Sequence, residues 1–122
     1  GPNAQDAIGG VPALSAGAEA ANAIQVTIQA KDAAGNNLAE RRLVQVWIAD
    51  AQWGTEATLA PSGGVVVDTG TTVRALVANI DLMILSDASG VIQITVTEVT
   101  AKTFWVHAEC AAKVGAVAAV FA

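Results

Sequence analysis

The segment AIQVTIQA, residues 23–30, indicates the class of fold. Its apolar residues Ile24, Val26 and Ile28 alternate with polar residues. Because successive side chains of a strand point to opposite faces, this alternation predicts a strand with one buried face. The segment VIQITVTE, residues 91–98, alternates in the same way. The two segments therefore predict a sheet that is apolar on one side and polar on the other.

Other segments of the chain extend this pattern. RRLVQVWIAD (41–50) and TFWVHAECAA (103–112) also alternate, while VVVD, TTVRALVA, DLMILS and AVAAVFA are short β-prone runs. Turn signals separate the runs at intervals of roughly 8–12 residues, which is typical of an antiparallel sandwich or barrel. No helical period is sustained after residue 22, so crossover helices and a parallel sheet are not expected. We predict an all-β protein of seven or eight strands.

Two turns of similar sequence interrupt the chain, DAAGNN after Lys31 and DASG after Ser86. A calcium loop needs oxygen ligands at alternate positions, and Ala34 and Val91 stand where two of those ligands would be. We therefore predict hairpin-type turns in which glycine supplies a positive φ and aspartate bonds back to the turn backbone. The residues expected to form these turns are Asp32, Gly35, Asn36, Asp87 and Gly90.

The residues that most often carry chemistry are scarce. The chain has one histidine, His107, and one cysteine, Cys110, and they fall on opposite faces of one predicted strand. They cannot bind one zinc ion from that strand, and no nucleophile elbow accompanies the histidine. We expect His107 to be an outward-facing polar residue and Cys110 to pack as a small hydrophobe. The sequence predicts no catalytic residue, no metal site and no cofactor.

Composition narrows the choice of partners. The net charge is −5, and the six Lys and Arg form no basic run, so neither nucleic acid nor an anionic membrane is an expected partner. Charged residues make up 14% of the chain, against about 25% in typical domains. Either abundant alanine inflates the apolar content, or part of the apolar surface is buried against other subunits.

The chain divides into two parts by composition. We expect residues 1–22, rich in Gly, Ala and Ser, to be an N-terminal arm or linker, and residues 23–122 to be one β-sandwich domain. Gly1-Pro2 is expected to be the scar of tag removal. The arm could pack on a neighbouring subunit, or form a short helix over 15–21. The last predicted strand is apolar on both faces, which suits either an inner strand or a subunit interface.

Interfaces favour large apolar side chains that carry a polar group, such as tryptophan. We expect the tryptophans outside the predicted core, together with apolar residues of the arm and of the last strand, to contact partners. These candidate interface residues are Ile8, Val11, Leu14, Trp53, Trp105, Val117, Val120 and Phe121.

Residues 23–112 resemble a bacterial Ig-like domain of the invasin/intimin kind. The resemblance lies in IQVTIQAKDAAGNNLAERRLVQVWIAD and SDASGVIQITVTEVTAKTFWVHAEC, where strands flank Asp-rich turns. It implies an Ig-like antiparallel β-sandwich. The chain departs from that family by holding one module, whereas invasin-type modules occur in tandem arrays.

Nearly the whole chain also resembles small virion proteins of tailed bacteriophages. The shared segments are NAIQVTIQAKDAAGNNLAE, VQVWIAD, APSGG, LSDASGVIQITVTEVTAKTFWV and VAAVFA. This resemblance implies a non-enzymatic protein of the virion, assembled in the bacterial cytoplasm. Its expected role is head decoration or another surface role, with the major capsid protein or a tail protein as partner and self-association as a homo-oligomer, such as a trimer. The alternative that the sequence leaves open is an adhesin module that binds a host surface ligand.

Overall fold

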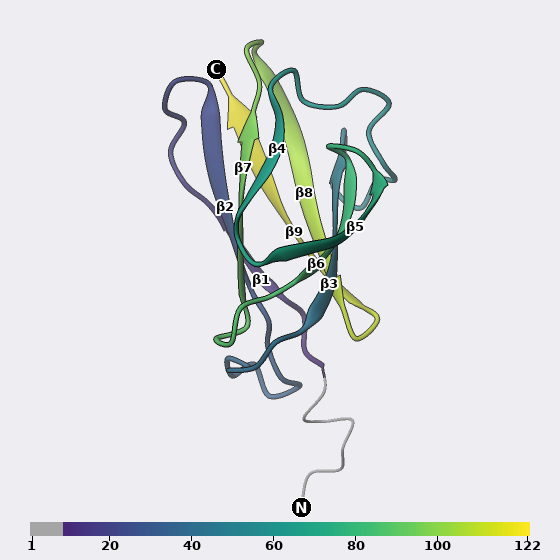
Figure 1. The fold of residues 1–122 in the computed structure, drawn as a ribbon. Coiled ribbons are helices and arrows are strands. Elements are labelled where there is room, and N and C mark those ends of the chain that lie inside the picture. Colours follow the sequence, from purple (N-terminus) through teal and green to yellow (C-terminus); the bar gives the residue numbers. More distant parts are fainter. Residues whose placement is uncertain (1–8) are drawn as a thin grey trace, which may run out of the picture.

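Nine strands and no helix make up residues 9–122, the part of the chain that the computed structural model describes (Figure 1). The strands are β1 (Ala13–Ala16), β2 (Ala23–Gln29), β3 (Leu43–Ala49), β4 (Gly64–Thr69), β5 (Thr71–Val77), β6 (Asp81–Leu85), β7 (Val91–Thr97), β8 (Lys102–Cys110) and β9 (Lys113–Phe121).

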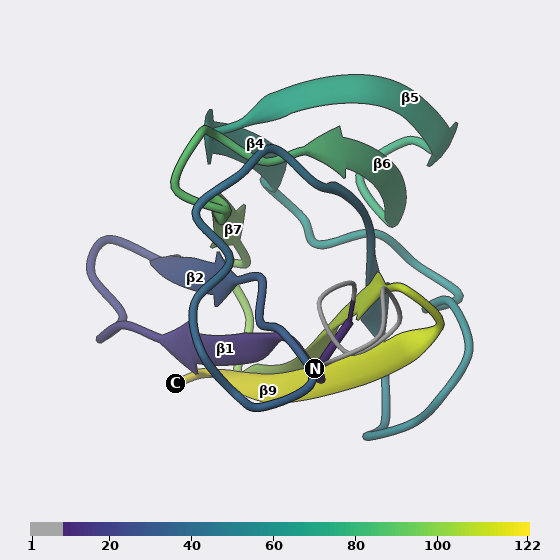
Figure 2. The same cartoon turned by 90° about the horizontal axis from the view of Figure 1, so that it is seen from below.

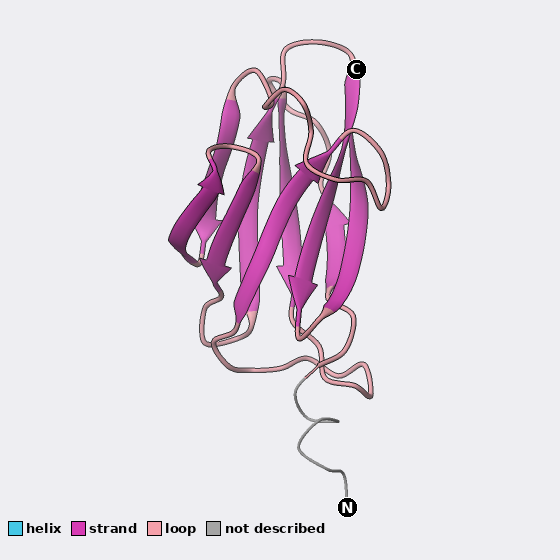
Figure 3. Cartoon of the chain, turned by 90° about the vertical axis from the view of Figure 1, so that its right-hand side faces the viewer, coloured by secondary structure: helices cyan, strands magenta, loops and turns pink. Residues whose placement is uncertain are grey.

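The strands form two sheets in which every pairing is antiparallel (Figure 3). One sheet has the order β1-β2-β7-β4, and the other has the order β5-β6-β3-β8-β9. The prediction of an all-β, antiparallel sandwich is therefore confirmed, but the prediction of seven or eight strands is wrong, because the described residues form nine.

The core lies between the inner faces of the two sheets. Ile24, Val26 and Ile28 of β2 are buried. The alternating residues of β7 lie beside them in the same sheet, and those of β3 and β8 face them from the other sheet. Burying one such aliphatic side chain contributes about 1.5–3 kcal/mol, so these four strands supply most of the stabilisation. Besides the three residues of β2, the core contains Val44, Val46, Ile48, Ala57, Leu82, Ile84, Ile92, Ile94, Val96, Phe104, Val106, Ala108, Cys110, Ala119 and Phe121.

One side of the sandwich is closed by β1 and β9, which lie against each other (Figure 2). Leu14 of β1 packs on the core, and a Cβ added at Gly115 of β9 would overlap the carbonyl oxygen of Pro12. The ammonium of Lys113 donates a hydrogen bond to the Gly9 carbonyl at 3.0 Å. Thus the described part of the predicted arm runs along β9 and adds a strand to the sandwich. This cover explains why the last strand is apolar on both faces.

On the opposite side the chain passes from one sheet to the other at Gly70, between β4 and β5. Gly70 has a φ of +106°, and a Cβ there would lie 2.9 Å from the carbonyl oxygen of Leu85. Glycine therefore permits the sharp bend that carries the chain across. Beyond it, β5 is paired only with β6, and all seven residues of β5 are exposed. At the β5 edge, the five-stranded sheet thus extends past the four-stranded sheet (Figure 2).

The two Asp-Ala-X-Gly segments are turns with positive φ at glycine, +86° at Gly35 and +74° at Gly90. The Asp32 carboxylate accepts the Asn36 N–H at 2.8 Å. The Asp87 carboxylate accepts two backbone N–H groups, those of Ser89 and Val91, each at 2.9 Å. The carboxylates therefore hold the turn backbone.

Substitution of the two turn glycines should give unequal losses of stability. At Gly35 an added Cβ meets nothing within 4 Å, so Gly35→Ala carries only the backbone cost of about 1–2 kcal/mol. At Gly90 the added Cβ overlaps the carbonyl oxygen of Leu38, which adds about 1–3 kcal/mol of overpacking. Urea unfolding of both variants measures the difference. Equal losses would contradict the packing described for Gly90.

Candidate functional site

The outer face of the five-stranded sheet gathers polar and aromatic residues from three strands. The register places Trp47 of β3 between Asp81 of β6 and His107 of β8. In the next row, Gln45 of β3 pairs with Glu109 of β8. Residues that alternate outward on separate strands therefore meet on one surface.

His107 is buried within this outer face, although it points away from the core. The Trp47 ring stacks on the His107 ring with centroids 4.9 Å apart and planes 6° apart, and the Trp53 ring meets it edge-on at 5.9 Å. The sequence predicted an outward-facing polar residue at this position. His107 does point outward, but the prediction that it is exposed is wrong, because two tryptophans cover the ring.

A hydrogen bond defines the protonation of this histidine. The backbone N–H of Trp53 donates to His107 Nε2 at 2.8 Å, so Nε2 carries no proton and the neutral ring carries its proton on Nδ1. Burial lowers the pKa of His107, and the backbone of Trp105 offsets part of that effect. The ring is therefore a neutral support beneath Trp47.

The loop of residues 50–63 folds back over the sheet and forms one wall of a pocket. The indole N–H of Trp47 donates to the carbonyl oxygen of Gly54 at 3.1 Å, which fixes the orientation of the ring. Further along the loop, the Ala57 N–H donates to the Ile48 carbonyl at 2.8 Å. The loop is thus anchored to β3 on both sides of Thr55 and Glu56.

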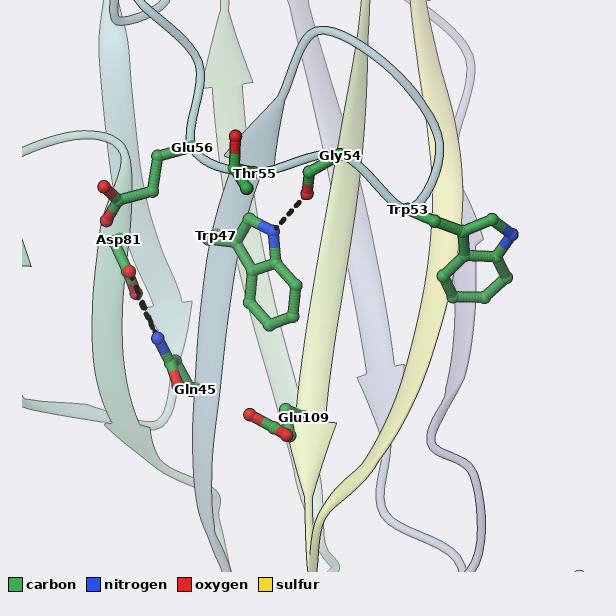
Figure 4. Close-up of a pocket in the computed structure, with 8 residues that line it drawn as sticks. All are labelled: Gln45, Trp47, Trp53, Gly54, Thr55, Glu56, Asp81 and Glu109. Atoms are coloured by element: carbon green, nitrogen blue, oxygen red, sulfur yellow. Dashed lines mark hydrogen bonds between the residues drawn. The ribbon is translucent and has the colours of Figure 1, made fainter.

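The pocket between this loop and the sheet has a volume of about 540 Å³ (Figure 4). This volume lies within the range of roughly 300–1,000 Å³ that small-ligand sites occupy. Its lining combines two tryptophans, three residues with carboxyl groups and uncharged residues. The lining residues are Gln45, Trp47, Trp53, Gly54, Thr55, Glu56, Asp81 and Glu109.

The carboxyl groups make the pocket acidic. The Gln45 amide donates to both oxygens of Asp81, at 3.0 and 3.1 Å. A hydrogen bond to Asp81 raises the pKa of Glu56, and burial and charge repulsion from Asp81 raise it further. Neither lysine nor arginine lines the pocket. Among residues 9–122, no three His, Cys, Asp or Glu side chains are grouped as metal ligands.

The candidate interface residues do not form one surface. Trp53 and Val120 are exposed, at 62% and 60%, and Val11 is exposed as well, whereas Trp105 is half-buried. Leu14 and Val117 pack against the core.

Phe121 and Ile8 are the two remaining candidates. Phe121 is only 2% exposed because it packs edge-on against Phe104 in the core, so it offers no surface to a partner. Ile8 lies outside the described residues.

The exposed apolar strand β5 and most of the pocket were missed by the sequence analysis. TTVRALVA is recognisable as β-prone, but nothing in it shows that the strand lies beyond the opposing sheet. Gln45 and Glu109 occupy outward positions of alternating segments, yet their meeting depends on the pairing of β3 with β8. Glu56 lies on a long loop, whose path the sequence pattern does not define.

Acid should destabilise the protein in part through His107. Because burial lowers the pKa of His107 in the folded protein, the unfolded chain binds more protons than the folded protein when the pH falls below the ordinary value of about 6.5. The stability that depends on a neutral His107 is fully present above about pH 6.5, and it is lost as the pH falls toward the lowered pKa of His107 in the folded protein. We expect His107→Gln to reduce the loss of stability between about pH 7.5 and 5, as measured by urea unfolding. Parallel pH profiles for both proteins would contradict this assignment.

Comparison with known proteins gives no relative for this chain: no protein family, curated protein or solved structure matches it. Within residues 9–122 there is also no helix with the length and apolar character needed to cross a membrane.

Proposed function

We propose that this chain is a non-enzymatic structural protein of a bacteriophage particle, a head-decoration or other virion-surface protein. It binds a capsid or tail protein and associates with copies of itself. The resemblance of its sequence segments to small virion proteins suggests the setting. The observation that carries the binding role is the exposed apolar strand β5.

The proposed Ig-like character of the sandwich is supported by strand order. Ig domains pack an A-B-E-D sheet on a G-F-C sheet. The orders β1-β2-β7-β4 and β9-β8-β3 correspond to these sheets. β6 and β5 extend the second sheet past β3, where variable-type Ig domains also carry two additional strands. In this chain, however, β4 precedes β5 and β6.

β5 is suited to contact with another protein because, within residues 9–122, all seven of its residues are exposed. Val73 is 60% exposed and Leu76 is 44% exposed, and Val77 is exposed as well. Val73 and Leu76 lie at the two register shifts between β5 and β6. An ordered strand that presents such side chains to solvent is typical of a protein–protein contact.

The two bulges favour side-chain packing over extension of the sheet. Bulges bend an edge strand and interrupt its row of backbone donors and acceptors, which disfavours regular pairing with another strand. Each fully buried Val or Leu contributes about 1.5–3 kcal/mol before the costs of association. Apolar side chains on β5 would therefore supply binding energy to a partner surface.

A double substitution on β5 tests this role. We expect the wild-type chain to self-associate in size-exclusion chromatography with light scattering and to bind phage particles that lack it. Val73→Lys with Leu76→Lys should weaken both interactions at least about tenfold, since a loss of about 1.4 kcal/mol already corresponds to tenfold. Both side chains are exposed, so the unfolding midpoint should hardly change.

Val99→Lys is the matched control, because Val99 is an exposed apolar residue in the turn between β7 and β8 and is not part of β5. It should leave association and particle binding unchanged. A chain that stays monomeric and binds no particle would contradict the proposed function. Binding to host cell surfaces alone would instead support the adhesin alternative.

A further inference from the structure

The floor of the pocket is the exposed face of an indole ring. His107 covers one face of Trp47 and is itself fully buried, whereas Trp47 lines the pocket. Figure 4 shows the ring of Trp47 face on, with the Glu109 carboxylate below it and the carboxylates of Glu56 and Asp81 to one side. The free face of the ring is thus presented to any group that enters the pocket.

The hydrogen-bonding groups of the pocket are mostly acceptors. The indole N–H of Trp47 is already donated to Gly54, and the Gln45 amide is already donated to Asp81. The carboxylate of Glu109 and the carboxyl groups of Glu56 and Asp81 contribute oxygens. A ligand that carries several donors and no acceptor therefore complements this lining.

We propose that the pocket binds the side chain of an arginine on a protein partner. A guanidinium group carries five N–H donors and no acceptor, and it is planar. It can stack on the free face of Trp47 while donating to the surrounding carboxylates. Its positive charge would also reduce the repulsion between Glu56 and Asp81. The pocket lining contains no lysine or arginine that could do so.

Arginine fits these observations better than the other candidates. A lysine ammonium has three donors but no flat surface to stack on the indole. A sugar can stack on tryptophan and donate to carboxylates, but its oxygens also need donors. The side-chain donors of Trp47 and Gln45 are occupied, which leaves only the Thr55 hydroxyl and the Trp53 indole N–H in the lining. The combination of a flat aromatic surface with an acceptor-rich, acidic lining therefore favours a planar cation.

This site is separate from the contact surface proposed on β5. None of the residues of β5 lines the pocket. Val73→Lys with Leu76→Lys should therefore leave arginine binding unchanged, and the loss of one interaction does not entail the loss of the other.

A peptide titration followed by NMR tests the proposal. The probe is acetyl-Gly-Arg-Gly-amide, and its control is the same peptide with citrulline, which keeps the shape of arginine but lacks the charge. We expect a saturable shift of the Trp47 indole N–H signal with the arginine peptide. Citrulline should bind at least about tenfold more weakly, since it loses both the cation–π contact with the indole and the charge-assisted hydrogen bonds to the carboxylates.

Charge-neutral variants locate the site. Glu56→Gln combined with Glu109→Gln should weaken binding of the arginine peptide at least about fivefold, since each removes a charged acceptor. The matched control is Glu40→Gln, which removes an exposed carboxylate outside the pocket. It should leave the affinity unchanged. Trp47→Leu should abolish binding, and the two glutamine substitutions keep the test valid if that variant does not fold.

Three results would overturn the proposal. The first is equal binding of the arginine and citrulline peptides. The second is the absence of a saturable shift at Trp47 with the arginine peptide. The third is binding of methyl glycosides at Trp47 without binding of the arginine peptide, which would assign the pocket to a saccharide.

Discussion

The alternation of apolar and polar residues in four strands, β2, β3, β7 and β8, is the constraint on which the rest of the structure depends. Their inward side chains form the interior of the sandwich. Because the side-chain period of a strand is two, a slip by one residue would turn every core residue outward. The same period fixes Trp47, His107 and Glu109 on the outer face. The core therefore determines the location of the pocket.

The pairing of β3 with β8 links this core to both proposed functions. Its inner rows hold Val46, Ile48 and Val106, while its outer rows place Trp47 beside His107. The histidine supports the indole from below, and the loop of residues 50–63 holds it from the side through Gly54. The sheet continues through β6 to β5. The pocket and β5 therefore lie on one sheet but share no residue, so two partners could bind them independently.

The sequence predicts what local patterns determine. Alternation was sufficient to predict β2, β3, β7 and β8, and the all-β class followed from them. It did not reveal β1, because ALSA at 13–16 has little pattern and becomes a strand only by pairing with β2. The burial of His107 depends on tryptophans from β3 and from a loop, and the exposure of β5 depends on the unequal size of the two sheets. Such features arise from contacts distant in sequence, which no local period contains.

Native-state hydrogen exchange tests the central claim, that four strands form the stable core while β5 is exposed along its whole length. The account predicts that core amides of β2, β3, β7 and β8 exchange only through global unfolding, and that amides of β5 exchange through local opening at much lower free energy. It also predicts that β5 becomes protected when a partner binds. Protection of β5 in the free monomer as strong as that of β3 would contradict the account.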